Sequence, residues 1–248
     1  MPDQLYDAIF KRRSVRRYEP RDLDEPSLAD VRSFMAKLEP MLPGMRTELR
    51  ILGKEAVRGM FKVDAPHFLA IFSEPKEGHL ANAGFMLQQM DLFLSSMGIG
   101  SCWQGGPKLA GEQRGSSDLE FVIMLAFGRA AEEVHRTDLS QFQRKPLASM
   151  TSIEGRDDLL EAARLAPSGM NNQPWFFAGG DGVVRAFGRK SLVADRMNRV
   201  SVGISLCHLW LAGVRSGASP EVFREDGGEA PRGYSYVASM RLNDGKQA

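Results

Sequence analysis

The predicted order of secondary-structure elements occurs twice along this chain of 248 residues, which limits the folds open to it. In the first half, a helix beginning at Glu25-Pro26 precedes short apolar strands, and a long helix over Leu80–Met97 precedes a buried strand at Phe121–Phe127. After a connector at 145–151, the order helix, strand, helix, strand begins again. The second set comprises a helix at 157–166, a hairpin of strands at 175–178 and 183–187, a helix at 200–216 and a strand at 236–242.

Glycines in the two long helices allow the halves to be compared residue by residue. Gly84 stands 119 residues before Gly203, and Gly98 stands 119 residues before Gly217. Matches between glycines are often due to chance, so two unrelated halves stay an alternative. We expect an internal duplication in which residues 1–145 and 146–248 are the two halves of one intertwined domain.

Charge and composition argue against several classes of function. Lys and Arg number 32 against 31 for Asp and Glu, and the resulting net charge of +1 argues against general binding to nucleic acid or acidic membranes. The two cysteines form no Cys-x-x-Cys pair, and the four histidines have no metal-ligand spacing. The start of the chain lacks an apolar signal segment, and the apolar run Val200–Val214 is shorter than the roughly 20 residues of a membrane helix. We expect a cytoplasmic protein without a metal or membrane partner.

A basic segment follows a short helix that is predicted at the start of the chain, before residue 11. Residues 11–17 contain five basic side chains, a density that suits one small anion better than a polyanion. In an extended chain alternate side chains share a face, so Arg12, Ser14 and Arg16 would point the same way and could clamp a phosphate. A solvated basic turn is the alternative, because such runs are common on protein surfaces.

A polar loop lies far away in the second half, within Pro167–Trp175. Ser168, Asn171 and Gln173 carry the hydroxyl and amide groups that hydrogen-bond a flat heterocycle with both donors and acceptors. A polar turn capped by asparagine side chains would have the same composition, so both interpretations stay open.

The third notable segment is Gly98–Pro107, which is rich in glycine. Its glycines would let backbone amides approach a ligand closely. The segment is not a dinucleotide fingerprint, because Trp103 occupies the position of the third glycine and a helix is predicted where a strand should precede it. A helix C-cap followed by a plain loop is the alternative.

In this order, the three segments resemble the FMN-dependent nitroreductase family, and most closely its internally duplicated branch, in which one chain imitates the usual homodimer. The resemblance implies an α+β nitroreductase fold of two pseudo-repeat halves, with mainly antiparallel sheets flanked by helices. Each flavin site of the family takes an Arg-rich segment and a glycine loop from one subunit and a Pro-Ser-x-x-Asn segment from the other. On that pattern the cofactor-binding residues are Arg12, Arg13, Ser14, Arg16, Trp103, Gln104, Gly105 and Gly106 from the first half, Ser168, Gly169, Asn171 and Gln173 from the second, and Arg144 or Lys145 against the phosphate.

The second flavin site of a duplicated chain lacks its motifs. With the halves compared 127 residues apart, Met41 stands opposite Ser168 and Gly44 stands opposite Asn171. No Arg-Arg-Ser segment precedes the second-half helix. We therefore expect one FMN per chain, and a monomer could suffice because one chain imitates the dimer.

The resemblance implies an FMN-dependent NAD(P)H oxidoreductase that reduces nitroaromatics, quinones or similar flat acceptors by ping-pong hydride transfer through flavin N5. The motifs demand no side-chain acid or base, so we assign no catalytic residue. Two alternatives stay open: a flavin-binding storage or redox-sensing protein without turnover, and a flavin-destroying or dehalogenating relative. Such relatives usually carry a lid over the flavin, for which Met41–Met60 is the candidate segment.

Overall fold

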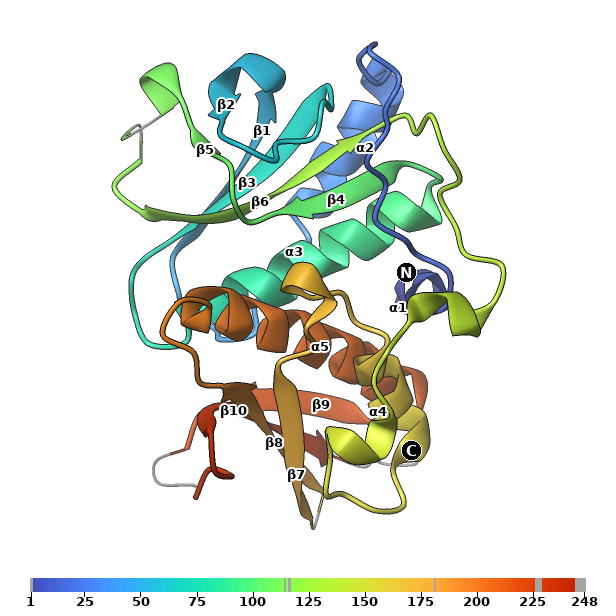
Figure 1. Cartoon of the computed structure of the whole chain (residues 1–248), viewed down its shortest axis with the longest axis vertical. Helices are drawn as coiled ribbons and strands as arrows, with labels where there is room; N and C mark the ends of the chain where they lie inside the picture. Colours follow the sequence, from blue (N-terminus) through green and yellow to red (C-terminus); the bar gives the residue numbers. More distant parts are fainter. Residues whose placement is uncertain (1, 114, 116, 181, 226–228, 244–248) are drawn as a thin grey trace.

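Two long helices lie between two β-sheets, so that the layers follow the order sheet, helix, helix, sheet (Figure 1). The computed structural model describes residues 2–113, 115, 117–180, 182–225 and 229–243. The central helices are α3 (His79–Ser96) and α5 (Asp195–Arg215), which contact each other along their length. Both helices bury side chains on nearly every face, because each packs against the other helix and against a sheet.

The two sheets have four strands each, and every neighbouring pair of strands is antiparallel. The first sheet, in spatial order, contains β1 (Thr47–Gly53), β3 (His67–Ser73), β6 (Glu120–Gly128) and β4 (Gly100–Gln104). The second contains β7 (Trp175–Gly180), β8 (Val183–Arg189), β10 (Tyr234–Asn243) and β9 (Ser219–Phe223). A separate two-stranded ribbon joins β2 (Val57–Arg58) to β5 (Lys108–Leu109).

Shorter helices complete the layers. In α2 (Glu25–Met35), the Asp24 side chain accepts a 2.9 Å hydrogen bond from the backbone N–H of Ser27, and Pro26 lies in the first turn, as expected for a helix start. The remaining helices are α1 (Pro2–Ile9) and α4 (Asp157–Arg164), with 3₁₀ turns η1 (Lys54–Ala56), η2 (Gly111–Gln113), η3 (Leu139–Phe142), η4 (Leu147–Ser149) and η5 (Gly169–Asn171).

The two halves share one topology. Apart from the additional first helix α1, and counting only the strands of the four-stranded sheets, each half runs helix, strand, strand, helix, strand, strand. Each sheet places its fourth strand in chain order between its second and third. A single cluster of buried apolar residues draws members from both halves, including Leu87 of α3 and Leu206 of α5. Residues on both sides of the predicted boundary between 145 and 146 therefore contribute to this core.

The crossing of α3 and α5 is built from two glycines. A Cβ atom on Gly84 would lie 2.1 Å from the carbonyl oxygen of Val200, and one on Gly203 would lie 1.9 Å from that of Ala81. Ala81 and Val200 are also 119 residues apart, so the two contacts are the reciprocal pair that a two-fold axis produces. The contacts are compatible with an internal duplication, which stays a proposal.

The predicted α+β class is confirmed, and several element boundaries need correction. Residues 100–104 and 219–223, where the sequence predicted no strand, form the edge strands β4 and β9. Each has only five residues with no clear alternation, so its strand state depends on pairing with β6 or β10. The final long helix begins at Asp195, five residues earlier than expected. Among the described residues, no helix combines the length and apolar character needed to cross a bilayer.

Candidate functional site

The basic segment is held along the edge of the first sheet. Ser14 forms a parallel bridge with Ser101 of β4, and the backbone N–H of Val15 donates to the Ser101 carbonyl at 2.9 Å. The Tyr18 hydroxyl donates to the Val15 carbonyl at 2.7 Å. These contacts hold residues 12–16 along the edge of the first sheet, and Arg13 lines the same cavity as Arg12, Ser14 and Arg16.

Arg12 is buried, and its position is set by an acid from the central helix. Its side chain is 1% exposed, and Nε lies 3.0 Å from Oδ2 of Asp91, which is fully buried in α3. The ion pair leaves Arg12 Nε without an aligned hydrogen-bond acceptor, while Nη2 donates a long 3.3 Å bond to Ser14 Oγ. Asp91 also accepts a 2.6 Å bond from the Ser101 hydroxyl, so one carboxylate fixes both the basic segment and β4.

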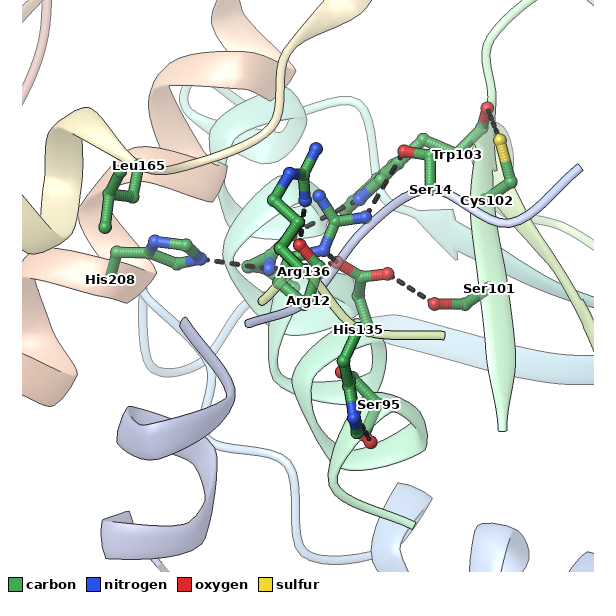
Figure 2. Close-up of polar contacts among 12 residues, drawn as sticks. Arg12, Ser14, Ser95, Ser101, Cys102, Trp103, His135, Arg136, Leu165 and His208 are labelled. Carbon is green, nitrogen blue, oxygen red and sulfur yellow. Dashed lines mark hydrogen bonds and ion pairs between the residues drawn. The ribbon is translucent and has the colours of Figure 1, made fainter. Parts of the chain in front are cut away.

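A buried polar network extends from this ion pair into the second half (Figure 2). The Gln88 amide nitrogen lies 3.1 Å from Asp91 Oδ2 and 3.0 Å from His208 Nε2, and its oxygen accepts from Trp103 Nε1 at 3.3 Å. His208 Nδ1 donates to the Ala162 carbonyl at 2.9 Å, which assigns the neutral tautomer with the proton on Nδ1. Complete burial lowers the pKa of His208 to about 3, so the histidine is neutral near pH 7.

The first cavity of the site, with a volume of about 510 Å³, is strongly cationic. Among the described residues that line it there is no aspartate or glutamate. Both halves contribute, since Pro167, Ser168 and Asn171 face the first-half residues across it. Its arginines are Arg12, Arg13, Arg16, Arg136 and Arg144.

Arg136 and Arg144 are the two arginines whose electrostatics are most unusual. Burial and the neighbouring Arg12 lower the pKa of Arg136 to about 10 and that of Arg144 to about 9. Their hydrogen-bond acceptors are neutral: Arg136 donates to the carbonyls of Arg12 and Gln141, and Arg144 donates to the Asn171 side chain and to two carbonyls. Arg144 Nε is buried without a hydrogen-bond partner. A bound anion would relieve this repulsion and satisfy the buried donor.

A second cavity of about 470 Å³ adjoins the first, and Ser14, Arg16, Pro167, Ser168 and Met170 line both. Arg16 is the one charged side chain among the described residues of its lining. The remaining wall is formed by Phe61, Cys102, Trp103, Gly105, Gly106, Ile123, Gly169, Asn172, Val193, Ala194, Met197, Asn198 and Ile204. Burial raises the pKa of the Cys102 thiol, which argues against a reactive thiolate in this wall.

Two predicted glycines lie on either side of one methionine. A Cβ on Gly105 would meet Met197 Cε at 2.2 Å, and a Cβ on Gly169 would meet Met197 Cγ at 2.6 Å. Met197 lies in the first turn of α5 and in the wall of this cavity, so the glycine-containing loops of both halves pack against the same side chain. A methionine is flexible enough to yield its place to a ligand.

Three of the predicted cofactor residues lie outside both cavities. Gln104 accepts a 3.1 Å bond from the Val63 backbone N–H, which anchors a neighbouring loop. Gln173 is 4% exposed, accepts from the Lys145 backbone N–H at 2.6 Å, and donates to the Asn171 carbonyl. Lys145 directs its Nζ to the Asn172 carbonyl at 2.5 Å. These side chains organise the polar loop, and of the pair Arg144 and Lys145 it is Arg144 that reaches the cavity.

Other residues of the site were not predicted from the sequence. Arg136, Phe61, Val193 and Met197 lie in segments without a motif. In the sequence Arg136 is only one of many arginines, because its place beside Arg12 (Figure 2) depends on how the chain folds after β6. Among the described residues, no three His, Cys, Asp or Glu side chains are grouped as metal ligands would be.

The chain is similar to one family of known proteins and to several solved structures. The family described as "Putative TM nitroreductase" matches residues 4–213. A crystal structure from Thermotoga maritima, described as a putative nitroreductase, is 19% identical with a TM-score of 0.68, covering 96% of this chain and 94% of that one. Its likeness shows the same fold.

Shorter solved structures match part of the chain. A nitroreductase family protein from Clostridium difficile is 17% identical with a TM-score of 0.47, covering 60% of this chain and 97% of its own. A nitroreductase with bound FMN from Desulfitobacterium hafniense is 14% identical with a TM-score of 0.43, covering 59% and 100%. No curated protein matches the sequence. Because the family match spans most of the chain, this protein belongs to the nitroreductase family.

Proposed function

We propose that the chain binds one FMN across its two halves and uses NAD(P)H to reduce flat organic acceptors. The observation that carries the proposal is the pair of adjoining cavities. One is lined by five arginines and, within the described part of the chain, by no aspartate or glutamate, and the other is mostly apolar. A phosphate would occupy the first and an aromatic ring system the second. FMN, when bound, supplies the redox centre that accepts a hydride and passes it on.

The phosphate end is supported by the charges that the fold leaves uncompensated. Arg136 and Arg144 contact neutral oxygens, and Arg144 Nε has no partner, so a phosphate would gain charge-assisted hydrogen bonds. Arg12 differs, because Asp91 already pairs with it. We infer that Arg136 and Arg144 bind the phosphate and that Arg12 forms the charged floor of the cavity.

The ring end is supported by the residues at the junction of the cavities. Ser14, Arg16 and Ser168 lie where a ligand passes from the polar cavity into the apolar one. The exposed Arg16 guanidinium would favour an electron-rich, reduced ring, while Gly105 and Gly106 leave their backbone N–H groups accessible to it. Trp103 walls this cavity and is held by Gln88.

The composite site also supports the duplication proposal. Phe61 and the arginine segment come from residues 1–145, whereas Ser168 and Met197 come from 146–248. We infer that one chain takes the place of the family homodimer, so a monomer would hold a complete site. An isologous crossing at Gly84 and Gly203 is what such a duplication would leave.

The phosphate assignment is tested by Arg136→Ala and Arg144→Ala. Each should weaken FMN binding by about 10- to 100-fold, the scale of losing hydrogen bonds to a charged group. Arg32→Ala, which removes an exposed arginine of α2 paired with Glu25, is the control and should bind FMN like the parent protein. The measurement is titration of flavin fluorescence; unchanged affinity in both cavity variants would contradict the assignment.

Turnover is tested separately from binding. Anaerobic NADH or NADPH should bleach the yellow protein, and a nitroaromatic should restore the colour. A flavoprotein that binds FMN tightly and is not bleached by either nucleotide would instead be a storage or sensing protein.

A further inference from the structure

The mouth of the apolar cavity carries three large apolar side chains that are almost fully exposed. Phe61 is 90% exposed, Met170 is 94% exposed and Val193 is 97% exposed, and all three line the same cavity. They come from three separate segments: the turn after β2, the η5 loop, and the connection from β8 to α5. Exposed apolar groups are common singly, but three gathered at one cavity mouth indicate a binding surface.

Two of these residues have a strained backbone. Phe61 has φ of 64° and Met170 has φ of 52°, the left-handed region that bulky side chains rarely adopt. Such residues cost on the order of 1–3 kcal/mol and persist where surrounding contacts impose them, often at ligand-binding sites. Here the strain keeps two large apolar side chains out of the core.

The turn that carries Phe61 is anchored to the glycine loop of the site. A Cβ on Gly59, whose φ is +133°, would lie 3.1 Å from Pro107 Cα, and one on Gly106 would lie 3.6 Å from the Met60 carbonyl oxygen. Lys62 Nζ donates to two carbonyls of the preceding turn, and Gln104 receives the Val63 N–H. Phe61 is therefore held in place on the side of the cavity formed by Gly105 and Gly106.

The charge distribution indicates what these side chains would contact. Arg16 is the one charged residue among the described lining of this cavity, and it lies at the junction with the polar cavity, which Met170 also lines. Phe61, Met170 and Val193 are uncharged, so a ligand that covers all three gains no ion pair from them. Aromatic and aliphatic faces of this kind favour an uncharged, flat ring system.

We propose that Phe61, Met170 and Val193 clamp the outer face of a fused-ring, uncharged acceptor, and that Phe61 selects fused rings over single rings. The proposal rests on the proposed function, because the acceptor must lie against the flavin in the same cavity. The second ring of a fused acceptor extends beyond the cavity and covers Phe61, whereas a single ring stays inside.

The chain offers matched controls. Met60 and Leu192 are direct neighbours of Phe61 and Val193, are 78% and 107% exposed, and are not part of the cavity lining. Met60→Ala and Leu192→Ala therefore remove equally exposed apolar groups that the proposal leaves without a role.

The experiment compares 1-nitronaphthalene with nitrobenzene. Binding is measured on the purified protein by quenching of tryptophan fluorescence, since Trp103 walls the cavity, and KM is measured with NADH on the FMN-loaded protein. Phe61→Ala should weaken binding and raise KM for 1-nitronaphthalene by roughly 3- to 10-fold, the scale of one aromatic contact, with a smaller change for nitrobenzene. In the control Met60→Ala, which lies outside the cavity lining, FMN affinity, bleaching by NADH and KM for both acceptors should be unchanged.

Failure of this proposal is distinct from failure of the proposed function. Equal effects on the two ligands, or equal effects of Phe61→Ala and Met60→Ala, would overturn the clamp while flavin binding and bleaching stand. Absence of flavin binding would overturn the proposed function, and the quenching titration would then still show whether Phe61 discriminates between the ligands.

Discussion

At the scale of single residues, the buried network beneath the site makes stability depend on pH through His208. The pKa of an unfolded histidine is about 6.5, and burial lowers that of folded His208 to about 3. Between about pH 6.5 and 3 the histidine is protonated in the unfolded chain but stays neutral in the folded protein. The free energy of unfolding therefore falls as the pH drops from about 6.5 towards 3. The slope should be about 1.4 kcal/mol per pH unit from this residue. Urea unfolding at several pH values should show a shallower slope for His208→Gln; parallel profiles would contradict the assignment.

Asp91 gives a second prediction at this scale. Asp91→Asn leaves the guanidinium of Arg12 buried without its negative partner, and removal of one member of a buried ion pair typically costs about 3–5 kcal/mol. Asp195→Asn is the control, because Asp195 and Arg199 are 40% and 35% exposed and such a pair contributes about 1 kcal/mol at most. Thermal unfolding should separate the two variants clearly, and similar losses would show that the Arg12–Asp91 pair is not needed for stability.

At the scale of elements, the crossing of α3 and α5 depends on two glycines. Gly84→Ala or Gly203→Ala would place a methyl group within about 2 Å of a backbone carbonyl of the other helix, so the helices must move apart. Alanine favours a helix over glycine by about 1 kcal/mol, yet we expect a net loss of 1–3 kcal/mol or more from overpacking. Gly180→Ala in β7 is the control, since nothing lies within 4 Å of its added Cβ. Denaturant unfolding measures the difference, and a stabilised Gly84→Ala variant would contradict this geometry.

At the scale of the whole molecule, the two halves share a topology but not a functional site. Gly78 and His79, at the start of α3, stand 119 residues before Met197 and Asn198. They line a cavity of about 280 Å³. Two arginines of its lining already have acidic partners: Arg199 pairs with Asp195 and Arg224 with Glu77. Met41, which stands opposite Ser168, is 2% exposed in the core.

We therefore predict one flavin for each chain. Protein saturated with FMN and then desalted should give a flavin-to-protein ratio near one by absorbance. A ratio near two would show that the smaller cavity binds flavin as well and that the second site persists.

The sequence by itself determined the helices, the buried strands and the segments that meet at the site, because apolar periodicity and turn residues act locally. It also predicted that Arg12–Arg16 and Pro167–Trp175 belong together, although only through resemblance to a family. The tertiary structure decided which side chains reach the cavities. Packing of α3 buries Arg12 against Asp91, and the path of residues 129–138 places Arg136 beside Arg12. The side chains of Gln104 and Gln173 accept hydrogen bonds from backbone N–H groups and so lie outside the cavities. These side-chain positions depend on contacts with residues distant in sequence, so no local sequence pattern predicts them.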